Sequence, residues 1–428
     1  MATRINIAFV RTLGTYTLSN IVATGIPFLL LPLLTRVLTP QDYGIVAMFG
    51  VVVSVFGAMA GLGSNGAVEV RYFNFDQKSM ASYVSACLWI LVVSALTLLL
   101  ITWLSAGILQ ALTAIPTDWI LMCVVVAALQ FVTLLRLSIW QVEGKAGKYA
   151  LMQVSQSGLN AALSVLLVVG LGLAWAGRLW GITLSAGLMG CVALSSLSRD
   201  QWLTREVQRE HLHDALRFGA PLVLHLIGGL LISTMDRWIL TNLLGVAQTG
   251  IYSVALQIGM VISLITGAAN KAYAPWLFRH LTKQTDLEKI QLVRYTYAYF
   301  LGILGLAVLI GLAAPVMLSV LVGRSFQAAS TIVPFVAIGY AFGGMYFMVT
   351  NYVFVAGATA RLSLITVTAG AINLLCTYWL VQSHGISGAG YGFMVSQLFL
   401  FLGTWALAQS VHPMPWLKAL YPGQVQIP

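Results

Sequence analysis

The sequence APLVLHLIGGLLISTMDRWILTNLLGVAQTGIYSVALQIGMVISLITG, Ala220–Gly267, contains two long apolar runs that meet at Gly245. Its only acidic or basic residues, apart from one histidine, are Asp236 and Arg237, which stand next to each other inside the first run. A helix of about 20 apolar residues crosses a hydrocarbon layer of ~30 Å. The stretch therefore predicts two membrane-spanning helices, the first of which carries a pair of opposite charges.

The rest of the chain has the same character. Of its 428 residues, 59% are hydrophobic and 8% are charged, and the mean hydropathy is +0.90. Soluble domains carry about 25% charged residues, so this composition excludes a soluble protein. The net charge of +10 does not indicate a nucleic-acid partner, because basic residues of membrane proteins gather on the cytoplasmic side. Single cysteines within apolar runs predict buried side chains and no disulfide or metal site: Cys87, Cys123, Cys191 and Cys376.

Twelve apolar segments predict an all-α integral membrane protein, because they are too long for the strands of a barrel. We expect an N-terminal six-helix bundle at 1–198, a cytoplasmic linker at 199–217 that includes a short interfacial helix, and a second six-helix bundle with a short cytoplasmic tail at 218–428. The predicted spans are 12–35, 43–63, 80–104, 118–140, 150–173, 178–198, 218–243, 249–270, 294–320, 328–353, 361–382 and 387–410.

Charge in the loops predicts that both termini are cytoplasmic. With the N-terminus inside, eighteen of the 22 lysines and arginines fall on or near the cytoplasmic side and three outside, and Arg237 alone lies well inside a helix. Such an asymmetry is typical of a correct helix count. The longest polar segments, which include 65–79, are then cytoplasmic, and Asp236 is the one acidic residue placed well inside the bilayer.

The two halves also resemble each other. A shift of 206 residues pairs Gly44 with Gly250, and a shift of 211 pairs Gly177 and Gly181 with Gly388 and Gly392. Glycines four residues apart let helix backbones approach closely. Since each half has an even number of helices, we expect a parallel repeat about a pseudo-two-fold axis along the membrane normal. The alternative is chance similarity between two apolar sequences.

Asp236 and Arg237 are the first candidates for a binding site. An ionisable side chain in a spanning helix costs about 2.5–3.5 kcal/mol at mid-membrane, so it faces a bundle interior or a wet cavity. The functional interpretation is a fixed cation for an anionic ligand, and the alternative is a buried ion pair. Arg71, Lys271 and Arg136 are further cationic candidates near the inner mouth, or else ordinary interfacial anchors.

Amide residues within the predicted spans also have two possible roles. Asn20, Asn160, Gln257 and Asn373 lie within predicted spans, where an amide serves either a binding site or a hydrogen bond between helices. No catalytic motif is present in the sequence, so we do not expect an enzyme, a cofactor or a metal.

Three stretches carry a family resemblance. MDRWILTNLLGVAQTGIYSVALQIG (Met235–Gly259), LPLLTRVLTPQDYGIVAMF (Leu31–Phe49) and GISGAGYGFMVSQ (Gly385–Gln397) are similar to segments of the O-antigen flippases. These are polysaccharide-biosynthesis transporters of the multidrug/oligosaccharidyl-lipid/polysaccharide exporter superfamily. The resemblance covers nearly the whole chain.

The resemblance implies transport by alternating access between two six-helix bundles. The implied cargo is an oligosaccharide on an undecaprenyl pyrophosphate carrier, a unit of O-antigen, lipopolysaccharide or a similar surface polysaccharide. It would move from the cytoplasmic to the periplasmic leaflet of a bacterial inner membrane, beside membrane lipid and other polysaccharide-assembly proteins, and Arg237 would hold its pyrophosphate. The alternatives are a cation-coupled multidrug antiporter of the same fold and a membrane glycan polymerase.

Overall fold

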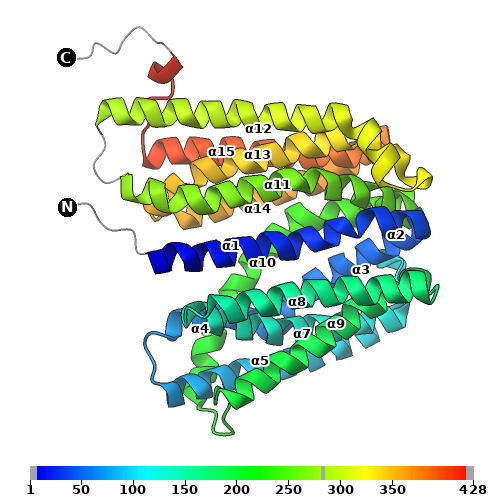
Figure 1. Ribbon diagram of the computed structural model, residues 1–428, viewed down its shortest axis with the longest axis vertical. Helices are drawn as coiled ribbons and strands as arrows, with labels where there is room; N and C mark the ends of the chain where they lie inside the picture. The colour runs from blue at the N-terminus through cyan, green and yellow to red at the C-terminus, as the bar shows by residue number, and fades with distance from the viewer. Residues whose placement is uncertain (1–6, 281–284, 421–428) are drawn as a thin grey trace. The chain divides into compact units, whose positions relative to one another are not determined.

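The computed structural model describes residues 7–280 and 285–420, and in these residues it contains helices and no strands (Figure 1). The all-α class is therefore confirmed. The longer helices are α1 (Ile7–Leu29), α2 (Leu31–Val37), α3 (Pro40–Met59), α4 (Ser64–Arg71), α5 (Gln77–Leu104), α6 (Ala106–Thr113), α7 (Thr117–Val142), α8 (Ala146–Val165), α9 (Ala174–Arg199), α10 (Arg209–Leu244), α11 (Val246–His280), α12 (Asp286–Leu321), α13 (Val333–Val355), α14 (Thr359–His384) and α15 (Ile386–Val411). Short helical segments are η1 (Ala60–Gly63), η2 (Leu166–Gly170), η4 (Arg324–Thr331) and η5 (Lys418–Leu420).

Each predicted span corresponds to a helix or to a broken helix of the structure. Among the described residues, 11 helical segments are long and apolar enough to cross a membrane. The helix α10, with 36 residues, occupies the place of the predicted seventh span. It begins at Arg209, so residues 209–217 of the predicted linker belong to this long helix and do not form a separate one.

The chain divides into two compact units. Unit 1 contains Met1–Leu230 and Gly245–Gly250, and unit 2 contains Leu231–Leu244 and Ile251–Pro428. The helix α10 thus contributes its first part to unit 1 and its last part to unit 2. The predicted bundles at 1–198 and 218–428, which would assign each helix to one half, stay a prediction.

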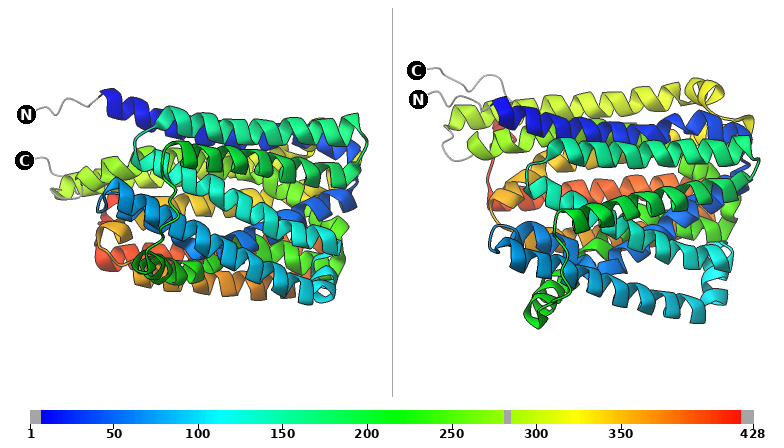
Figure 2. Two further views of the ribbon diagram at one scale, coloured as in Figure 1. Left: turned by 90° about the horizontal axis from the view of Figure 1, so that it is seen from below. Right: turned by 60° about the horizontal axis from the view of Figure 1, so that its bottom comes forward.

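Close helix packing organises unit 1. In the pair α8–α9, a Cβ on Gly177 would lie 2.8 Å from the carbonyl carbon of Leu167, and a Cβ on Gly181 would lie 2.9 Å from the backbone nitrogen of Ser164. The two backbones therefore approach as closely as glycine permits. Both views of Figure 2 also show the green segment before α10 beside the blue α5. There the hydroxyl of Ser85 accepts the backbone N–H of Thr204 at 2.9 Å.

Unit 2 repeats the same pairing in α14–α15. A Cβ on Gly388 would lie 2.6 Å from the nitrogen of Val381, and a Cβ on Gly392 would lie 2.9 Å from Cα of Thr377. The glycines matched by the sequence shift thus occupy equivalent places in two equivalent helix pairs, which supports the repeat. The core of this unit is rich in aromatic rings. Phe300, for example, packs edge-on against Phe401 with ring centroids 5.2 Å apart.

The second span is broken between α3 and α4. Gly61, Leu62 and Gly63 all have positive φ, at 68°, 49° and 68°, a conformation that glycine adopts easily and leucine rarely. The freed N–H of Gly61 donates to the hydroxyl of Ser94 at 2.9 Å. The span then continues as α4 to Arg71. The segment from residue 65 onward, expected to be polar and cytoplasmic, therefore begins with a helix, and its cytoplasmic location stays a prediction.

Candidate functional site

Asp236 is held by its own unit. Its side chain is 1% exposed and accepts hydrogen bonds from the Tyr252 hydroxyl on α11 and from the backbone N–H of Arg237, the latter at 2.8 Å. The Arg237 side chain is half-buried beside it. A carboxylate accepting two hydrogen bonds keeps part of its solvation when it is buried. The last turns of α10 therefore carry a built polar site and not an isolated charge.

Arg71 binds a carboxylate of the linker region. Its Nε and Nη2 donate to the two oxygens of Asp214 at 2.9 and 2.7 Å, and the Tyr83 hydroxyl donates to the same carboxylate at 2.9 Å. The Arg71 guanidinium holds the pKa of Asp214 below its usual range, and the Tyr83 hydrogen bond adds to this. Next to it, the buried ring of His211 lies 3.1 Å from the hydroxyl of Ser82. These contacts attach the start of α10 to the helices α4 and α5.

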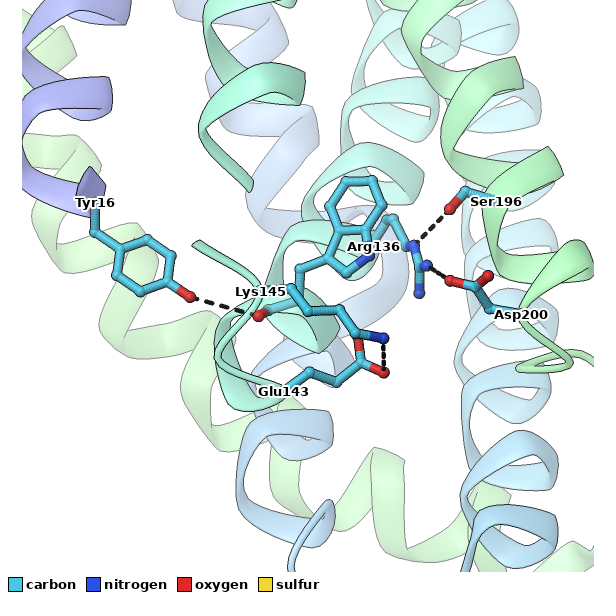
Figure 3. Close-up of polar contacts among 7 residues, drawn as sticks. Tyr16, Arg136, Glu143, Lys145, Ser196 and Asp200 are labelled. Atoms are coloured by element: carbon cyan, nitrogen blue, oxygen red, sulfur yellow. Dashed lines mark hydrogen bonds and ion pairs between the residues drawn. The ribbon is translucent and has the colours of Figure 1, made fainter. Parts of the chain in front are cut away.

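Arg136 lies deep in unit 1, where its contacts are visible in Figure 3. It forms an ion pair with Asp200 and donates from Nε to the hydroxyl of Ser196 at 3.0 Å. Its guanidinium carbon stands 4.4 Å from the centre of the Trp140 ring. Because the Arg136 side chain is 0% exposed, its charge depends on these protein partners.

The five predicted site residues therefore lie in different surroundings. In unit 1, Arg71 and Arg136 bind two different carboxylates. In unit 2, Asp236 and Arg237 are neighbours, and Lys271 is an exposed residue of α11. Their common role in binding cargo stays a prediction.

The intramembrane amides of the sequence analysis mostly serve helix packing. Asn20 accepts a hydrogen bond from the Gln153 amide at 2.6 Å, and Asn373 donates to the Ser396 hydroxyl at 3.0 Å. Asn160 accepts a hydrogen bond from Arg178. For these three residues the alternative of a hydrogen bond between helices is therefore confirmed.

One carboxylate was missed. Glu69 lies in α4, within the second span, and accepts a hydrogen bond from the Ser138 hydroxyl at 2.6 Å. Sequence alone put Glu69 in a loop, because the break at Gly61–Gly63 looks like the end of the helix.

Unit 1 also contains a cavity of about 680 Å³. Its wall comes from both sides of the broken span, from α7 and α8, and from the first part of α10. No acidic or basic residue is among those that line it. They are Ser54, Gly57, Ala58, Gly63, Asn65, Ala127, Gln130, Phe131, Thr133, Leu134, Leu137, Gln156, Leu226, Gly229 and Leu230.

Sequence reasoning did not single out the polar residues of this cavity. The sequence feature that could have indicated them is a single amide residue inside an apolar run. The same feature also occurs at residues whose side chains only form hydrogen bonds between helices. Which amides share one cavity depends on the rotation of each helix about its axis, and composition does not report this.

Comparison with known proteins decides the family. A model of a family described as "Polysaccharide biosynthesis protein" matches residues 9–281. The chain belongs to this family. The match covers more than half of the chain and includes the cavity, Asp236 and Arg237. The family resemblance inferred from the three sequence stretches is confirmed at this level.

Two relatives of this polysaccharide biosynthesis protein occur in Haemophilus influenzae. A protein of the Lsg locus is 24% identical over 353 residues, covering 81% of this chain and 85% of its own. A second relative, called an uncharacterized membrane protein, is 25% identical over 369 residues, covering 84% of this chain and 87% of its own.

Solved structures share the fold. The lipid II flippase MurJ in an inward closed conformation aligns with a TM-score of 0.73 at 12% identity, over 97% of this chain and 88% of that one. An inward-facing multidrug resistance MATE transporter of the MOP superfamily aligns with a TM-score of 0.70 at 17% identity, over 92% of this chain and 94% of that one. The fold of this family member is therefore that of the MurJ and MATE transporters.

Proposed function

We propose that the protein is a flippase for oligosaccharides linked to undecaprenyl pyrophosphate, the units of O-antigen, lipopolysaccharide or a similar surface polysaccharide. It moves them by alternating access from the cytoplasmic to the periplasmic leaflet of the bacterial inner membrane, and it is not an enzyme. Its partners are the lipid-linked oligosaccharide, membrane lipid and other membrane proteins of polysaccharide assembly. The observation that carries this proposal is a cavity among the helices of unit 1, mostly apolar but with three amide residues in its wall, in a chain that belongs to the polysaccharide biosynthesis family.

Two further observations support a lipid-linked cargo. The fold is shared with a transporter whose description names lipid II, and a flippase must shelter a polar group while it crosses hydrocarbon, where an unsatisfied polar group costs several kcal/mol. A neutral cavity suits the hydroxyl-rich part of such a molecule. The pyrophosphate requires a cation elsewhere.

Arg237 is the cation to which we assign the pyrophosphate. It lies in the family-matched region, within α10 and next to the buried carboxylate of Asp236. Lys271 on α11 is an exposed second candidate in the same unit. Arg71 and Arg136, which form ion pairs with Asp214 and Asp200, are the remaining cationic candidates.

A cation-coupled multidrug antiporter is the second candidate. It is favoured by the likeness to MATE transporters and by the buried carboxylate of Asp236 in α10. The lining of the cavity argues against it, because no carboxylate is present there to attract a cationic drug. A glycan polymerase has no such support.

Deletion of the gene tests the proposal. The deletion strain should accumulate lipid-linked oligosaccharide on the cytoplasmic leaflet and lose surface polysaccharide, and a plasmid copy should restore export. Drug resistance is measured in the same strains. Normal polysaccharide export together with a new drug sensitivity would reject the flippase in favour of the antiporter.

A further inference from the structure

Three residues with amide side chains line the cavity of unit 1. Asn65 comes from α4, Gln130 from α7 and Gln156 from α8, and all three are half-buried. Within the described part of the chain, none of these three side chains makes a hydrogen bond to the protein. Each amide has two donors and a carbonyl acceptor to offer.

Other amides in the candidate spanning helices pair with each other. Gln153 donates to Asn20 at 2.6 Å, and Asn351 donates to Asn270 at 2.9 Å. Such pairs avoid the cost of several kcal/mol that an unpaired polar group carries in hydrocarbon. The cavity amides can avoid that cost only with water or a ligand as partner, so the cavity is built to hold something polar.

The chemistry of the lining restricts the ligand. Among the lining residues whose side chains the structure describes, none is acidic or basic, which argues against a phosphate and against a cation. An amide complements a hydroxyl group, because both donate and accept. Ser54 and Thr133 donate their own hydroxyl hydrogens to the carbonyls of Gly50 and Leu129 at 2.8 and 3.2 Å, which leaves their oxygens as acceptors.

The break in the second span places an aromatic ring in the same wall. A Cβ on Gly61 would collide with the ring of Phe131, so the ring occupies space that only glycine leaves open. Phe131 lines the cavity beside Gln130. Phe131 is 5% exposed, so it offers the cavity a small apolar patch next to the amides, against which the C–H groups of a sugar ring can lie.

We propose that this cavity is a saccharide subsite, in which Asn65, Gln130 and Gln156 hydrogen-bond the hydroxyls of a neutral glycosyl unit that packs on Phe131. The inference rests on the proposed function and deepens it, because it separates recognition of the sugar in unit 1 from the charged group assigned to Arg237. The volume of about 680 Å³ falls within the range of about 300–1,000 Å³ that is typical of ligand sites.

Photolabelling of the full-length protein tests the proposal without requiring transport. The protein is placed in lipid nanodiscs free of sugar detergents and exposed to a dodecyl maltoside that carries a diazirine on its sugar. Parallel arms use dodecyl chains with a diazirine on a phosphate, a quaternary ammonium or an alcohol head group. We expect the maltoside to label residues 54–65, 127–137 and 156, and the other three probes to label them at least about fivefold less.

Variants assign the labelling to the amides. Gln130→Leu and Gln156→Leu should each reduce maltoside labelling about fivefold, because each removes hydrogen bonds to the ligand. The matched control is Gln141→Leu, which changes an exposed glutamine of α7 that does not line the cavity. If a leucine variant is not recovered as a monodisperse protein, the methionine variant of the same position replaces it.

The outcomes separate the two proposals. Labelling that is unchanged in the Gln130 and Gln156 variants, or equal for the maltoside and the alcohol, overturns the saccharide subsite and leaves the flippase proposal standing. Labelling as expected, with normal polysaccharide export in the deletion strain, supports a sugar site and rejects the flippase.

Discussion

Gly44 and Gly250 make reciprocal backbone contacts. A Cβ on Gly44 would collide with the carbonyl oxygen of Val246, and a Cβ on Gly250 would collide with that of Pro40. The shift of 206 residues that pairs the two glycines also pairs Pro40 with Val246. Pro40 lies four residues before Gly44, and Val246 lies four residues before Gly250. Each glycine therefore contacts the other half's copy of the residue four positions before it, as expected where two-fold related helices cross.

We predict that Gly44→Ala and Gly250→Ala each destabilise the protein by about 1–3 kcal/mol, because the added methyl group must push two backbones apart. The measurement is thermal unfolding in a mild detergent. Gly50→Ala is the control, since a Cβ at that position of α3 meets nothing within 4 Å. Equal stability of the Gly44 and Gly50 variants would show that the close approach is not needed.

Removing one charge of the Arg136–Asp200 ion pair should lower the stability of the protein by an amount that depends on which residue is changed. Asp200→Asn leaves a charge on an arginine that is 0% exposed, and it should cost about 3 kcal/mol. Arg136→Met leaves a carboxylate that is 33% exposed and can be hydrated, so it should cost less. The double variant should be more stable than Asp200→Asn alone, as measured by chemical denaturation. Full stability of Asp200→Asn would mean that Arg136 does not depend on Asp200 and has another anionic partner. Such independence from Asp200 is what its predicted role in cargo binding requires.

The contact of Arg71 with Asp214 predicts a dependence of stability on pH. The pKa of Asp214 is lowered in the folded protein, chiefly by Arg71, so the carboxylate binds its proton more weakly when folded than when unfolded. Its contribution is then fully present above about pH 4, the usual range of an aspartate, and is lost as the pH falls through the lowered folded-state pKa. Since both side chains are about one-third exposed, we expect about 1 kcal/mol.

Thermal unfolding of Asp214→Asn and wild type across pH 3–8 measures this contribution. The difference between them should be constant near neutral pH and should shrink only under acid conditions. Glu206→Gln is the control, because this exposed residue of the linker region does not share the contact. A difference that disappears between pH 8 and pH 6 would contradict the assignment to Asp214.

The proposed topology places residues 210 and 410 on the cytoplasmic side. Reporter fusions after each of these positions should therefore be active in the cytoplasm and inactive in the periplasm, because basic residues are concentrated in the segments assigned to that side. A periplasmic signal at either fusion would reject the parallel relation of the two halves.

Arg237→Ala should reduce polysaccharide export at least about tenfold at matched protein level, because the proposed pyrophosphate ligand loses a cation. Lysine should restore part of the activity, since a point charge does not offer the paired donors of a guanidinium. Asp236→Asn and Tyr252→Phe should have smaller effects, since the first weakens and the second removes the same hydrogen bond. Wild-type export by the Arg237→Ala variant would show that Asp236 and Arg237 have a purely structural role.

The sequence by itself determined the membrane class, the order of the spanning helices and the glycine pattern of the repeat. These follow from local properties. A run of about 20 apolar residues must form a helix in lipid, and glycines four residues apart mark a close helix contact wherever they occur. The matched pairs Gly177–Gly181 and Gly388–Gly392 accordingly fell in equivalent places.

Only the tertiary structure decided which side chains meet. Arg71 and Asp214 are 143 positions apart, and Asn65, Gln130 and Gln156 come from three helices, yet each set converges. Convergence depends on the rotation and crossing of helices, which are set by packing between residues distant in the chain. The break at Gly61–Gly63 likewise looked like a helix end, because a short glycine turn within a span and a loop after one have the same local composition.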